Sequence, residues 1–516
     1  MAGAALLALA LGVYWPALAA GTVWDDGLFV FENAVIRSPG GLRDIWLTTR
    51  LMDYYPVTSS LFWLEWRLFG PDPAPYHGVQ VALHALSALV AWRVLRRLAV
   101  PGAFVAAAAF AVHPVAVEVA AWISETKTTL SFLLFGLALG AYLRFEEGER
   151  PRWYAAALGL FLLALLAKTS VVALPAVLLL LAWWRRGRIG REDLWRSLPF
   201  FGLSLALGLL TVQQQQLHAI GTLEVRPEGL ASRVAAAGWG LCFYAWKLLV
   251  PVRLSAVYPR WEVDPSWPPA WAPLAAALAL AALAWRGRAG PGRPCLAAFG
   301  YFALMLAPVL GFVAFGFHRY SLVADHLVYP AMIGPVALAV AAAARWLEGR
   351  RPAAWQRAGL ALALLAPLAA LAQQRVHVFH DHQSLWSATL AANPRAWVAH
   401  YNLGVAIDRA GDSRAAIPHF RRVLELHPEH AEAHDALGRA LRRDGRLDEA
   451  IPHHRRAIEL EPRFAAAHNH LGNALRARGD LEGAIRHYRL ALEIAPDLEE
   501  ARVNLERALR EQDRTR

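Results

Sequence analysis

The chain has 516 residues, of which 57% are hydrophobic and only 18% are charged, with 21 Trp and a mean hydropathy of +0.31. A water-soluble protein cannot bury so much apolar surface, so the composition excludes that class and predicts an integral membrane protein with two or more domains. The net charge of +11 does not indicate a nucleic-acid-binding protein, because the basic residues gather in short runs between apolar segments.

Four arginine-rich runs separate the apolar segments, at 93–97, 185–191, 286–293 and 345–357. Cytoplasmic loops of membrane proteins carry an excess of Lys and Arg, so each run predicts a cytoplasmic loop. The two cysteines, Cys242 and Cys295, lie in or near apolar segments and indicate no disulfide framework.

The first apolar run, at about 3–20, ends in small residues like those of a signal-peptide cleavage site, but no basic residue precedes it. We therefore expect an uncleaved first helix that begins in the cytoplasm. Further spans are predicted at about 77–95, 100–112, 127–144, 153–167, 171–184, 195–212, 270–285, 296–314, 327–344 and 358–374. Residues 232–250 are expected to be re-entrant or interfacial, because a crossing there would put the arginine run at 286–293 outside. The prediction is an all-α transmembrane bundle of about eleven spans over residues 1–375.

Residues 376–516 form a second predicted domain, which is polar and repetitive. Gly404, Gly438 and Gly472 are spaced 34 residues apart, and prolines recur with the same period. A 34-residue period with small residues where paired helices touch resembles the tetratricopeptide repeat. Such helix pairs bury their apolar faces only by stacking, so the domain is predicted to be an α-solenoid with an interaction surface. After eleven spans, this domain would be periplasmic or lumenal.

Polar residues that are unusual at membrane depth fall in loops on one predicted side, the outer one. These loops contain the acidic pair Asp25-Asp26, "HPVAVEVAAWISETK" (113–127), the turn at Lys168 and "FHRYSLVADHLVYP" (317–330). Ionisable groups are costly there and usually serve a site, so the loops predict one cavity at the outer membrane surface. The alternative is that these residues have only structural roles, because an acidic pair can cap a helix and a lysine side chain can extend to lipid headgroups.

Several short motifs in these loops carry a resemblance to a known family. They are "WDDGLFVFEN", "YYPVT", "HPVAVEVAAWISETK", "LLAKTSVVALP" and "ADHLVYPAMIG". Their order, the long first outer loop and the attached repeats resemble the GT-C superfamily of polyprenyl-phosphate-dependent glycosyltransferases. Within it, the chain is similar to the transmembrane-and-TPR (TMTC-type) O-mannosyltransferases and their bacterial relatives, and the resemblance covers nearly the whole chain.

The resemblance implies that Asp25, together with Asp26, is the catalytic carboxylate. A carboxylate can act as the general base that takes the proton of an acceptor hydroxyl as its oxygen attacks the anomeric carbon. The polyprenyl phosphate that leaves needs fixed cations, and the candidates are Lys168, Arg319, His318 and His326. Further residues expected to line the site are His113, Glu118, Lys127, Asp325 and Tyr329.

The function implied is transfer of a sugar, a mannose-like hexose, from a polyprenyl-phosphate donor to a hydroxyl of a periplasmic or lumenal protein. The expected partners are the lipid-linked donor and a protein acceptor held in the repeat groove, at the inner membrane of a bacterium. The alternatives are a non-enzymatic repeat scaffold for envelope assembly and a GT-C enzyme that glycosylates a lipid or a glycan. No cofactor or metal site is predicted, and a requirement for a divalent cation is left open. Histidines on the repeat helices, such as His419, His453 and His468, are expected at the surface or in the groove.

Overall fold

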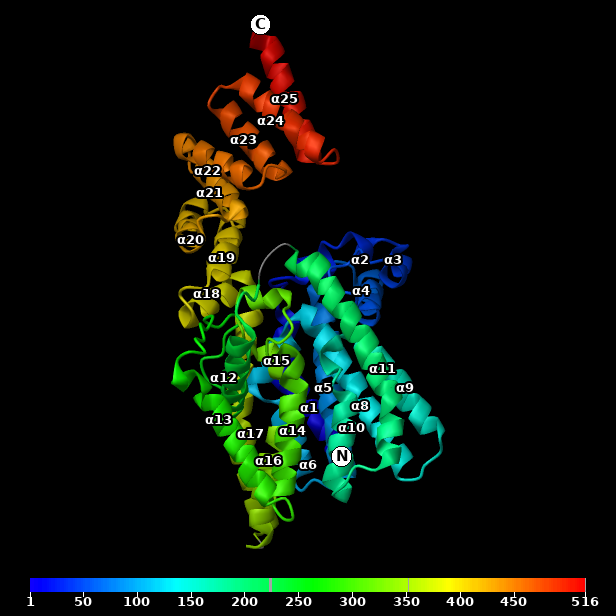
Figure 1. Cartoon of the computed structure of the whole chain (residues 1–516). Helices are drawn as coiled ribbons and strands as arrows, with labels where there is room; N and C mark the ends of the chain where they lie inside the picture. Colours follow the sequence, from blue (N-terminus) through cyan, green and yellow to red (C-terminus); the bar gives the residue numbers. More distant parts are fainter. Residues whose placement is uncertain (222–224, 351, 516) are drawn as a thin grey trace. The chain divides into compact units, whose positions relative to one another are not determined.

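Helices make up all the regular secondary structure in the computed structural model, which describes residues 1–221, 225–350 and 352–515 (Figure 1). The all-α prediction is thereby confirmed for the described residues. The chain divides into two compact units, Met1–Leu385 and Trp386–Arg516. The division falls inside α18 (His382–Ala392), whereas the composition of the sequence changes at about residue 375.

Among the described residues, eight helices are long and apolar enough to cross a membrane, as the hydropathy predicts. They contain α1 (Ala2–Tyr14), α5 (Pro73–Arg97), α8 (Thr126–Glu146), α10 (Leu174–Arg186), α11 (Arg191–Gln214), α13 (Ala272–Arg286), α14 (Gly292–Leu306) and α17 (Ala354–Val376). Most of them continue into an adjoining short helix, so that the full segments are 2–19, 73–97, 123–146, 169–186, 191–220, 268–286, 292–309 and 354–379, each of 18 residues or more. The first unit therefore has the composition and the helix lengths of a polytopic membrane domain.

Three other predicted spans are short or bent. α6 (Ala103–Ala111) is bent by 48° from the helical segment Pro114–Ala121, which ends in α7 (Val117–Ala121), and the two would make a ninth span if counted together. α9 (Arg152–Ala167) and α16 (Ile333–Glu348) have 16 residues each. A helix of that length is about 24 Å long, which is shorter than a hydrocarbon core of about 30 Å. The predicted count of eleven crossings is therefore not confirmed.

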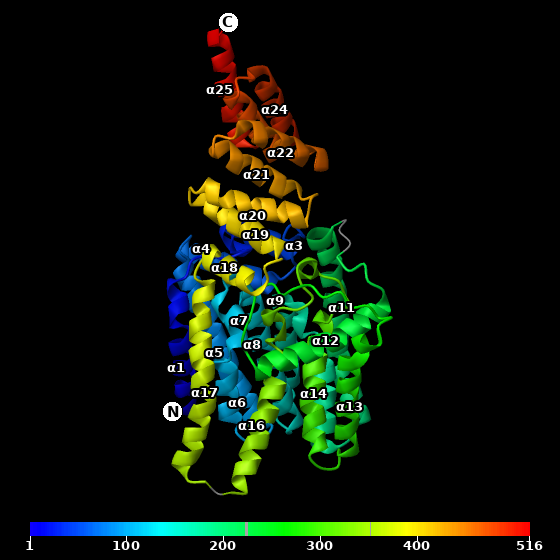
Figure 2. The ribbon, with the colours of Figure 1, turned by 90° about the vertical axis from the view of Figure 1, so that its left-hand side faces the viewer.

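The segment expected to be re-entrant forms α12 (Leu230–Leu249), which is not one of these eight helices. It packs closely on α13, since a Cβ atom on Gly238 would lie 2.7 Å from the Leu274 Cβ. Figure 2 shows α12 and α13 as neighbours at the edge of the bundle. This close approach depends on a residue without a side chain, and it fixes α12 against a helix long enough to span.

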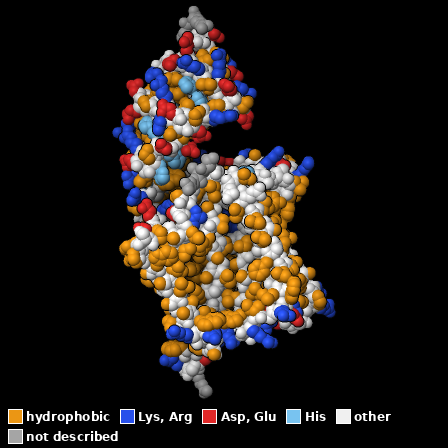
Figure 3. All heavy atoms as spheres, in the orientation of Figure 1, with side chains coloured by type: hydrophobic (Ala, Val, Ile, Leu, Met, Phe, Trp, Pro, Cys, Tyr) orange, Lys and Arg blue, Asp and Glu red, His pale blue; other side chains and the backbone are white. Residues whose placement is uncertain are grey.

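The two ends of the helix bundle differ in charge. Arginine side chains gather at the end where the N-terminus lies (Figures 1 and 3), and ion pairs there include Arg97 with Glu147 at 2.5 Å. Because α1 begins at this end and runs through the bundle, the acidic pair that follows it lies at the opposite end. α8 and α9 form an antiparallel hairpin, so Glu125 before α8 and Lys168 after α9 are also brought to that opposite end.

Short helices cover this opposite end. They are η2 (Gly27–Phe31), α2 (Ala34–Arg37), α3 (Gly41–Leu47) and α4 (Pro56–Phe69). Asn33 caps α2, because its side chain accepts hydrogen bonds from the backbone N–H groups of Val35 and Ile36 at 3.0 and 3.2 Å. The apolar side chains of the four short helices form a buried cluster with one residue of α5 and with the first residue of η4 (Ile123–Glu125). The cluster consists of Val30, Ile36, Ile45, Phe62, Tyr76 and Ile123. The long first loop is therefore a packed structure.

The second unit consists of stacked helix pairs, as the 34-residue period predicts. After α18 they are α19 (Trp397–Arg409), α20 (Ser413–Leu426), α21 (Ala431–Arg443), α22 (Leu447–Leu460), α23 (Ala465–Ala477), α24 (Leu481–Ile494) and α25 (Glu499–Thr515). The repeated glycines lie where paired helices touch: a Cβ on Gly404, Gly438 or Gly472 would come within 2.8, 2.7 or 2.6 Å of the ring of Phe420, His454 or Tyr488. The predicted solenoid is thereby confirmed.

Candidate active site

Asp26 joins the first loop to the beginning of α8. Its Oδ2 accepts a hydrogen bond from the Val23 backbone N–H at 2.8 Å, and its Oδ1 accepts from the Ser124 backbone N–H at 2.8 Å and the Ser124 hydroxyl at 2.6 Å. Burial and the neighbouring Asp25 carboxyl raise the pKa of Asp26 to about 7, whereas the Ser124 and Val23 donors lower it. Since both oxygens are engaged by the protein, Asp26 is a positioning residue in this geometry.

Asp25 has different surroundings, although it is adjacent in the sequence. Among the described residues, its Oδ1 is buried and has no hydrogen-bond partner. Burial raises the pKa of Asp25, while the Lys127 cation and the Ser124 hydroxyl lower it. A buried carboxylate oxygen without a protein partner, close to a cation, is available to take a proton from a bound molecule.

Trp24, immediately before the acidic pair, has an unusual backbone conformation. Its φ angle is +47°, in the left-handed region that side-chain-bearing residues seldom adopt and that costs about 1–3 kcal/mol. Its ring stacks on Trp122, with ring centroids 5.3 Å apart and an interplanar angle of 12°. The stack offsets part of the strain, and the sharp turn at Trp24 directs the two carboxyl groups towards η4 and α8.

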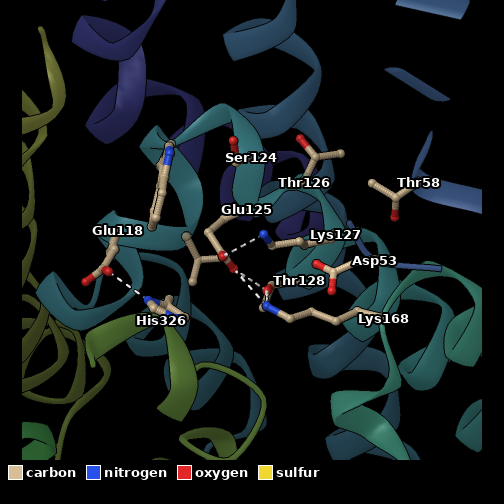
Figure 4. Close-up of polar contacts among 12 residues, drawn as sticks. Asp53, Thr58, Glu118, Ser124, Glu125, Thr126, Lys127, Thr128, Lys168 and His326 are labelled. Atoms are coloured by element: carbon tan, nitrogen blue, oxygen red, sulfur yellow. Dashed lines mark hydrogen bonds and ion pairs between the residues drawn. The ribbon is translucent and has the colours of Figure 1, made fainter. Parts of the chain in front are cut away.

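Glu125 brings the two lysines of the site together, as Figure 4 shows. Its Oε2 lies 3.2 Å from the Lys168 Nζ, and its Oε1 lies 3.8 Å from the Lys127 Nζ. Thr128 donates to the same carboxylate and accepts from Lys168 at 2.7 Å. We call Asp25, Asp26, Glu125, Lys127 and Lys168 the polar cluster. With three carboxyl groups and two lysines, the polar cluster is a buried charged site rather than a chance surface grouping.

Glu118 and His326 form a second buried pair beside the polar cluster. The Glu118 Oε1 lies 2.8 Å from the His326 Nδ1 (Figure 4), and Glu118 is fully buried. His326 comes from α15 (Asp325–Val328), and its ring lies edge-on to Trp122 with centroids 6.0 Å apart. Glu118 belongs to the loop at 113–127 and His326 to the loop at 317–330, so two of the predicted loops meet here.

A cavity of about 560 Å³ adjoins the polar cluster through Lys127. The Lys127 Nζ lies 4.1 Å from the centroid of the Phe29 ring, which also lines the cavity. Besides these two residues, its lining includes Arg50, Asp53, Tyr55, Thr58 and Phe62. No group of three or more His, Cys, Asp or Glu side chains among the described residues has the arrangement of metal ligands. The site can therefore bind an anion with lysine and arginine, and it can move a proton with Asp25.

Two residues expected to line the site lie elsewhere. His113 accepts from the Val115 backbone N–H at 3.3 Å and its Nε2 lies 3.1 Å from the Leu248 carbonyl oxygen, so it fixes the bend after α6. The Tyr329 hydroxyl lies 2.8 Å from the His84 Nδ1 in an aromatic core. Both side chains are engaged in packing away from the polar cluster, which differs from the expectation.

Three further candidates are near the site but have other partners. Asp325 pairs with Arg375 at 2.9 Å and thereby holds α15 to α17. His318 is fully buried, and burial lowers its pKa to about 3, so it is uncharged at neutral pH and cannot supply a fixed cation. Arg319 donates to two backbone carbonyls. Of the four predicted phosphate ligands, the structure brings Lys168 and His326 to the polar cluster.

Sequence reasoning missed several polar residues around the site. Ser124 holds Asp26, and Thr128 holds Lys168. Gln80, on α5, donates to the Val119 carbonyl and accepts from the Thr126 hydroxyl at 2.9 Å. The sequence contains a signal for these residues, because "SETKTT" (124–129) is a polar run at the beginning of an apolar helix. The run does not identify the partners of these side chains, which are far away in the chain.

Comparisons with known proteins agree with this architecture. A family model described as tetratricopeptide repeat matches residues 408–460 and 436–499. Protein O-mannosyl-transferase F38B6.6 of Caenorhabditis elegans is 29% identical over 148 residues, which are 26% of this chain and 21% of that relative. Protein O-mannosyl-transferase TMTC3 of Mus musculus is 26% identical over 174 residues, or 31% of this chain and 19% of the relative.

The chain is similar to TMTC-type protein O-mannosyltransferases. The resemblance read from its motifs is thereby confirmed at modest identity. The chain spans about a fifth of the length of the curated relatives that it matches. Among solved structures, a crystal structure of MamA protein is 25% identical, covering 25% of this chain and 72% of that one with a TM-score of 0.24.

Proposed function

We propose that the chain is a membrane glycosyltransferase of the GT-C type, which moves a mannose-like hexose from a polyprenyl-phosphate donor to a hydroxyl of a protein. Asp25 takes the acceptor proton while the acceptor oxygen forms a bond to the anomeric carbon. The bond from that carbon to the donor phosphate breaks, and its electron pair leaves with the phosphate. The reaction thus joins sugar to acceptor and releases the polyprenyl phosphate, with the proton on Asp25.

The single observation that carries this proposal is the unequal use of the two adjacent carboxyl groups. Asp26 is saturated by Val23 and Ser124, whereas the Asp25 Oδ1 is buried without a partner among the described residues. A purely structural acidic pair has no need for an unpaired buried oxygen, because leaving it so is unfavourable by about 1–3 kcal/mol. The relatives' printed names, which are protein O-mannosyl-transferases, support the same class of reaction.

Binding of the donor phosphate is assigned to the lysines of the polar cluster. Lys168 and Lys127 both face Glu125, and Lys127 also lines the cavity of about 560 Å³. A phosphate that enters the cavity competes with Glu125 for these ammonium groups, and their positive charge stabilises the phosphate as it leaves. Arg50, which also lines the cavity, supplies a further cation.

The repeat unit is proposed to bind the protein acceptor, since stacked helix pairs present surfaces that suit peptide segments. We place the polar cluster and the repeats on the periplasmic side of a bacterial inner membrane, because arginines gather at the other end of the bundle. A non-enzymatic scaffold would also use the repeats, but it would have no use for the polar cluster.

The test is transfer of labelled sugar by the purified full-length protein. The protein is incubated with labelled polyprenyl-phosphate mannose and a fraction of envelope protein, and label in protein is counted. Asp25→Asn should lower the rate by about 10²–10⁴-fold, the usual range for loss of a general base. Asp72→Asn is the matched control: it removes an exposed carboxyl group from the same loop, where Asp72 accepts a hydrogen bond from the Ala74 backbone N–H at 3.1 Å, a contact that Asn can keep.

The control variant should transfer sugar within a few-fold of the wild-type rate. Equal rates for Asp25→Asn and the wild type would rule out the proposed base. If neither protein transfers any polyprenyl-linked hexose to any protein fraction while both are folded, the scaffold alternative regains support.

A further inference from the structure

The repeat unit has a histidine pair in each of three successive repeats. The tetratricopeptide pattern places Trp three residues before its Leu-Gly, and this chain has His in each of those positions: His400, His434 and His468. On the second helix of the same repeat, 19 residues further on, each has a histidine partner: His419, His453 and His487. Figure 3 shows histidine side chains reaching the surface along these helices. The feature recurs with the repeat, so it is a property of the array.

The geometry of the three pairs is nearly identical. The Nδ1 atoms of the two rings are 3.1, 3.0 and 3.1 Å apart in chain order. The Nε2 of the first histidine lies 3.2, 3.0 and 3.3 Å from a backbone carbonyl, in turn that of Pro394, Pro428 and Pro462. A carbonyl oxygen only accepts, so this Nε2 carries the proton. The Nδ1 of the first ring therefore carries no proton, and its lone pair faces the second ring.

This arrangement is the one that metal-ligating histidines have. Such a histidine almost always donates its other ring N–H to a carbonyl or carboxylate, which fixes its tautomer and orientation. With metal–nitrogen bonds of about 2.05 Å, nitrogens 3.0–3.1 Å apart subtend an angle of about 95° at a shared ion. That angle is close to the cis angle of square-planar or octahedral coordination, which Ni²⁺ and Cu²⁺ prefer.

The charge around the pairs also allows a cation. The arginines that act on the first two pairs each form an ion pair with a glutamate: Arg422 with Glu425 at 2.5 Å, Arg421 with Glu449 at 3.3 Å and Arg456 with Glu459 at 3.0 Å. The third pair faces Arg455, Arg486 and Asp480. When an ion binds, the second ring moves its proton from Nδ1 to Nε2, so no proton need be released.

We propose that each histidine pair is a two-imidazole site for a divalent transition-metal ion of the Ni²⁺ or Cu²⁺ kind, which gives three sites in each chain. Within the described residues no third His, Cys, Asp or Glu side chain completes any pair. The remaining coordination positions are therefore open to water or to a donor side chain of a bound protein. The proposal is independent of the glycosyl transfer, because it involves none of the residues of the polar cluster.

The experiment uses the full-length protein in detergent, without an affinity tag of histidines, and Ni²⁺ as the probe. Equilibrium dialysis should give three bound ions per chain. The triple variant His419→Asn, His453→Asn and His487→Asn should bind none of the three, and each single variant should lose one. Asn is chosen because its amide N–H can still donate to the first ring, while amide nitrogen is a poor ligand.

His427→Asn is the matched control, since this histidine of the same array packs on Trp397 with ring centroids 5.0 Å apart; it should leave three ions bound. Electron paramagnetic resonance of the Cu²⁺ form should show coupling to two imidazole nitrogens at each site, and binding should disappear at acidic pH, where protons compete. Wild-type protein that binds neither ion, or a triple variant that binds as much as the wild type, would overturn the proposal.

Discussion

At the scale of single residues, Asp25 and Asp26 differ in what they contact. Asp26 links residues 98 positions apart through Ser124, and every oxygen of its carboxylate accepts a hydrogen bond. The Lys127 cation lowers the pKa of Asp25, and one oxygen of Asp25 has no hydrogen-bond partner within the described part of the chain. Asp26 therefore fixes the loop, and the free Asp25 oxygen is consistent with the proposed role of Asp25 toward the substrate.

This difference predicts opposite effects of two similar substitutions on stability. Asp26→Asn removes the charge and one of the two acceptor oxygens, so the free energy of unfolding should fall by about 1–3 kcal/mol. Asp25→Asn removes a buried charge with an unpaired oxygen, so the thermal midpoint should stay equal or rise. Both midpoints are measured on detergent-purified full-length protein. An Asp26→Asn midpoint equal to that of the wild type would contradict the assigned contacts.

At the scale of elements, a buried carboxylate joins neighbouring repeats. Asp435 on α21 lies 2.9 Å from the His454 Nδ1 on α22 and 2.8 Å from the His470 Nδ1 on α23. Burial raises the pKa of Asp435, but the hydrogen bonds from His454 and His470 outweigh this and hold it well below its ordinary value. Burial lowers the pKa of His454 below its ordinary value.

The lowered pKa of Asp435 and the lowered pKa of His454 affect the stability of the repeats in the same direction. A group whose pKa is lower in the folded state stabilises above its unfolded pKa and loses that contribution as pH falls through its folded value. The repeats should therefore become less stable as pH falls below about 6.5, the ordinary pKa of His. Asp435→Asn should reduce their stability at neutral pH by about 1–3 kcal/mol. Hydrogen exchange of peptides from α21 to α23 in the full-length protein measures both effects, once each rate is divided by the intrinsic rate at the same pH. Protection that changes neither with pH nor with the substitution would contradict this expectation.

Most helices could be predicted from the sequence, but the contacts between distant loops could not. Apolar runs predict α5, α8 and α11, and the 34-residue period predicts α19 to α24, because both patterns are local. The bounds of α16 were less predictable, since the span expected at about 327–344 begins only at Ile333, after the separate short helix α15. The partners of Asp26 and Glu125 could not be predicted, because Ser124 and Lys168 come to them only when distant loops close around the bundle.

At the scale of the whole molecule, each unit has its own kind of site. The membrane unit combines a buried carboxylate, two lysines and a cavity at the end of the bundle opposite the arginine-rich loops. The repeat unit has three histidine pairs and a stacked surface. These features support the proposal that the chemistry belongs to residues 1–385 and that the repeats bind the acceptor.

The central claim is that Asp25 performs the proton transfer while the lysines hold the donor phosphate. It is tested most directly by measuring donor binding and sugar transfer on the same full-length variants. Asp25→Asn should bind polyprenyl-phosphate mannose within a few-fold of the wild type and transfer it about 10²–10⁴-fold more slowly. Lys168→Met should instead weaken donor binding. A folded Asp25→Asn variant that transfers at the wild-type rate, or that loses donor binding while Lys168→Met retains it, would contradict the account.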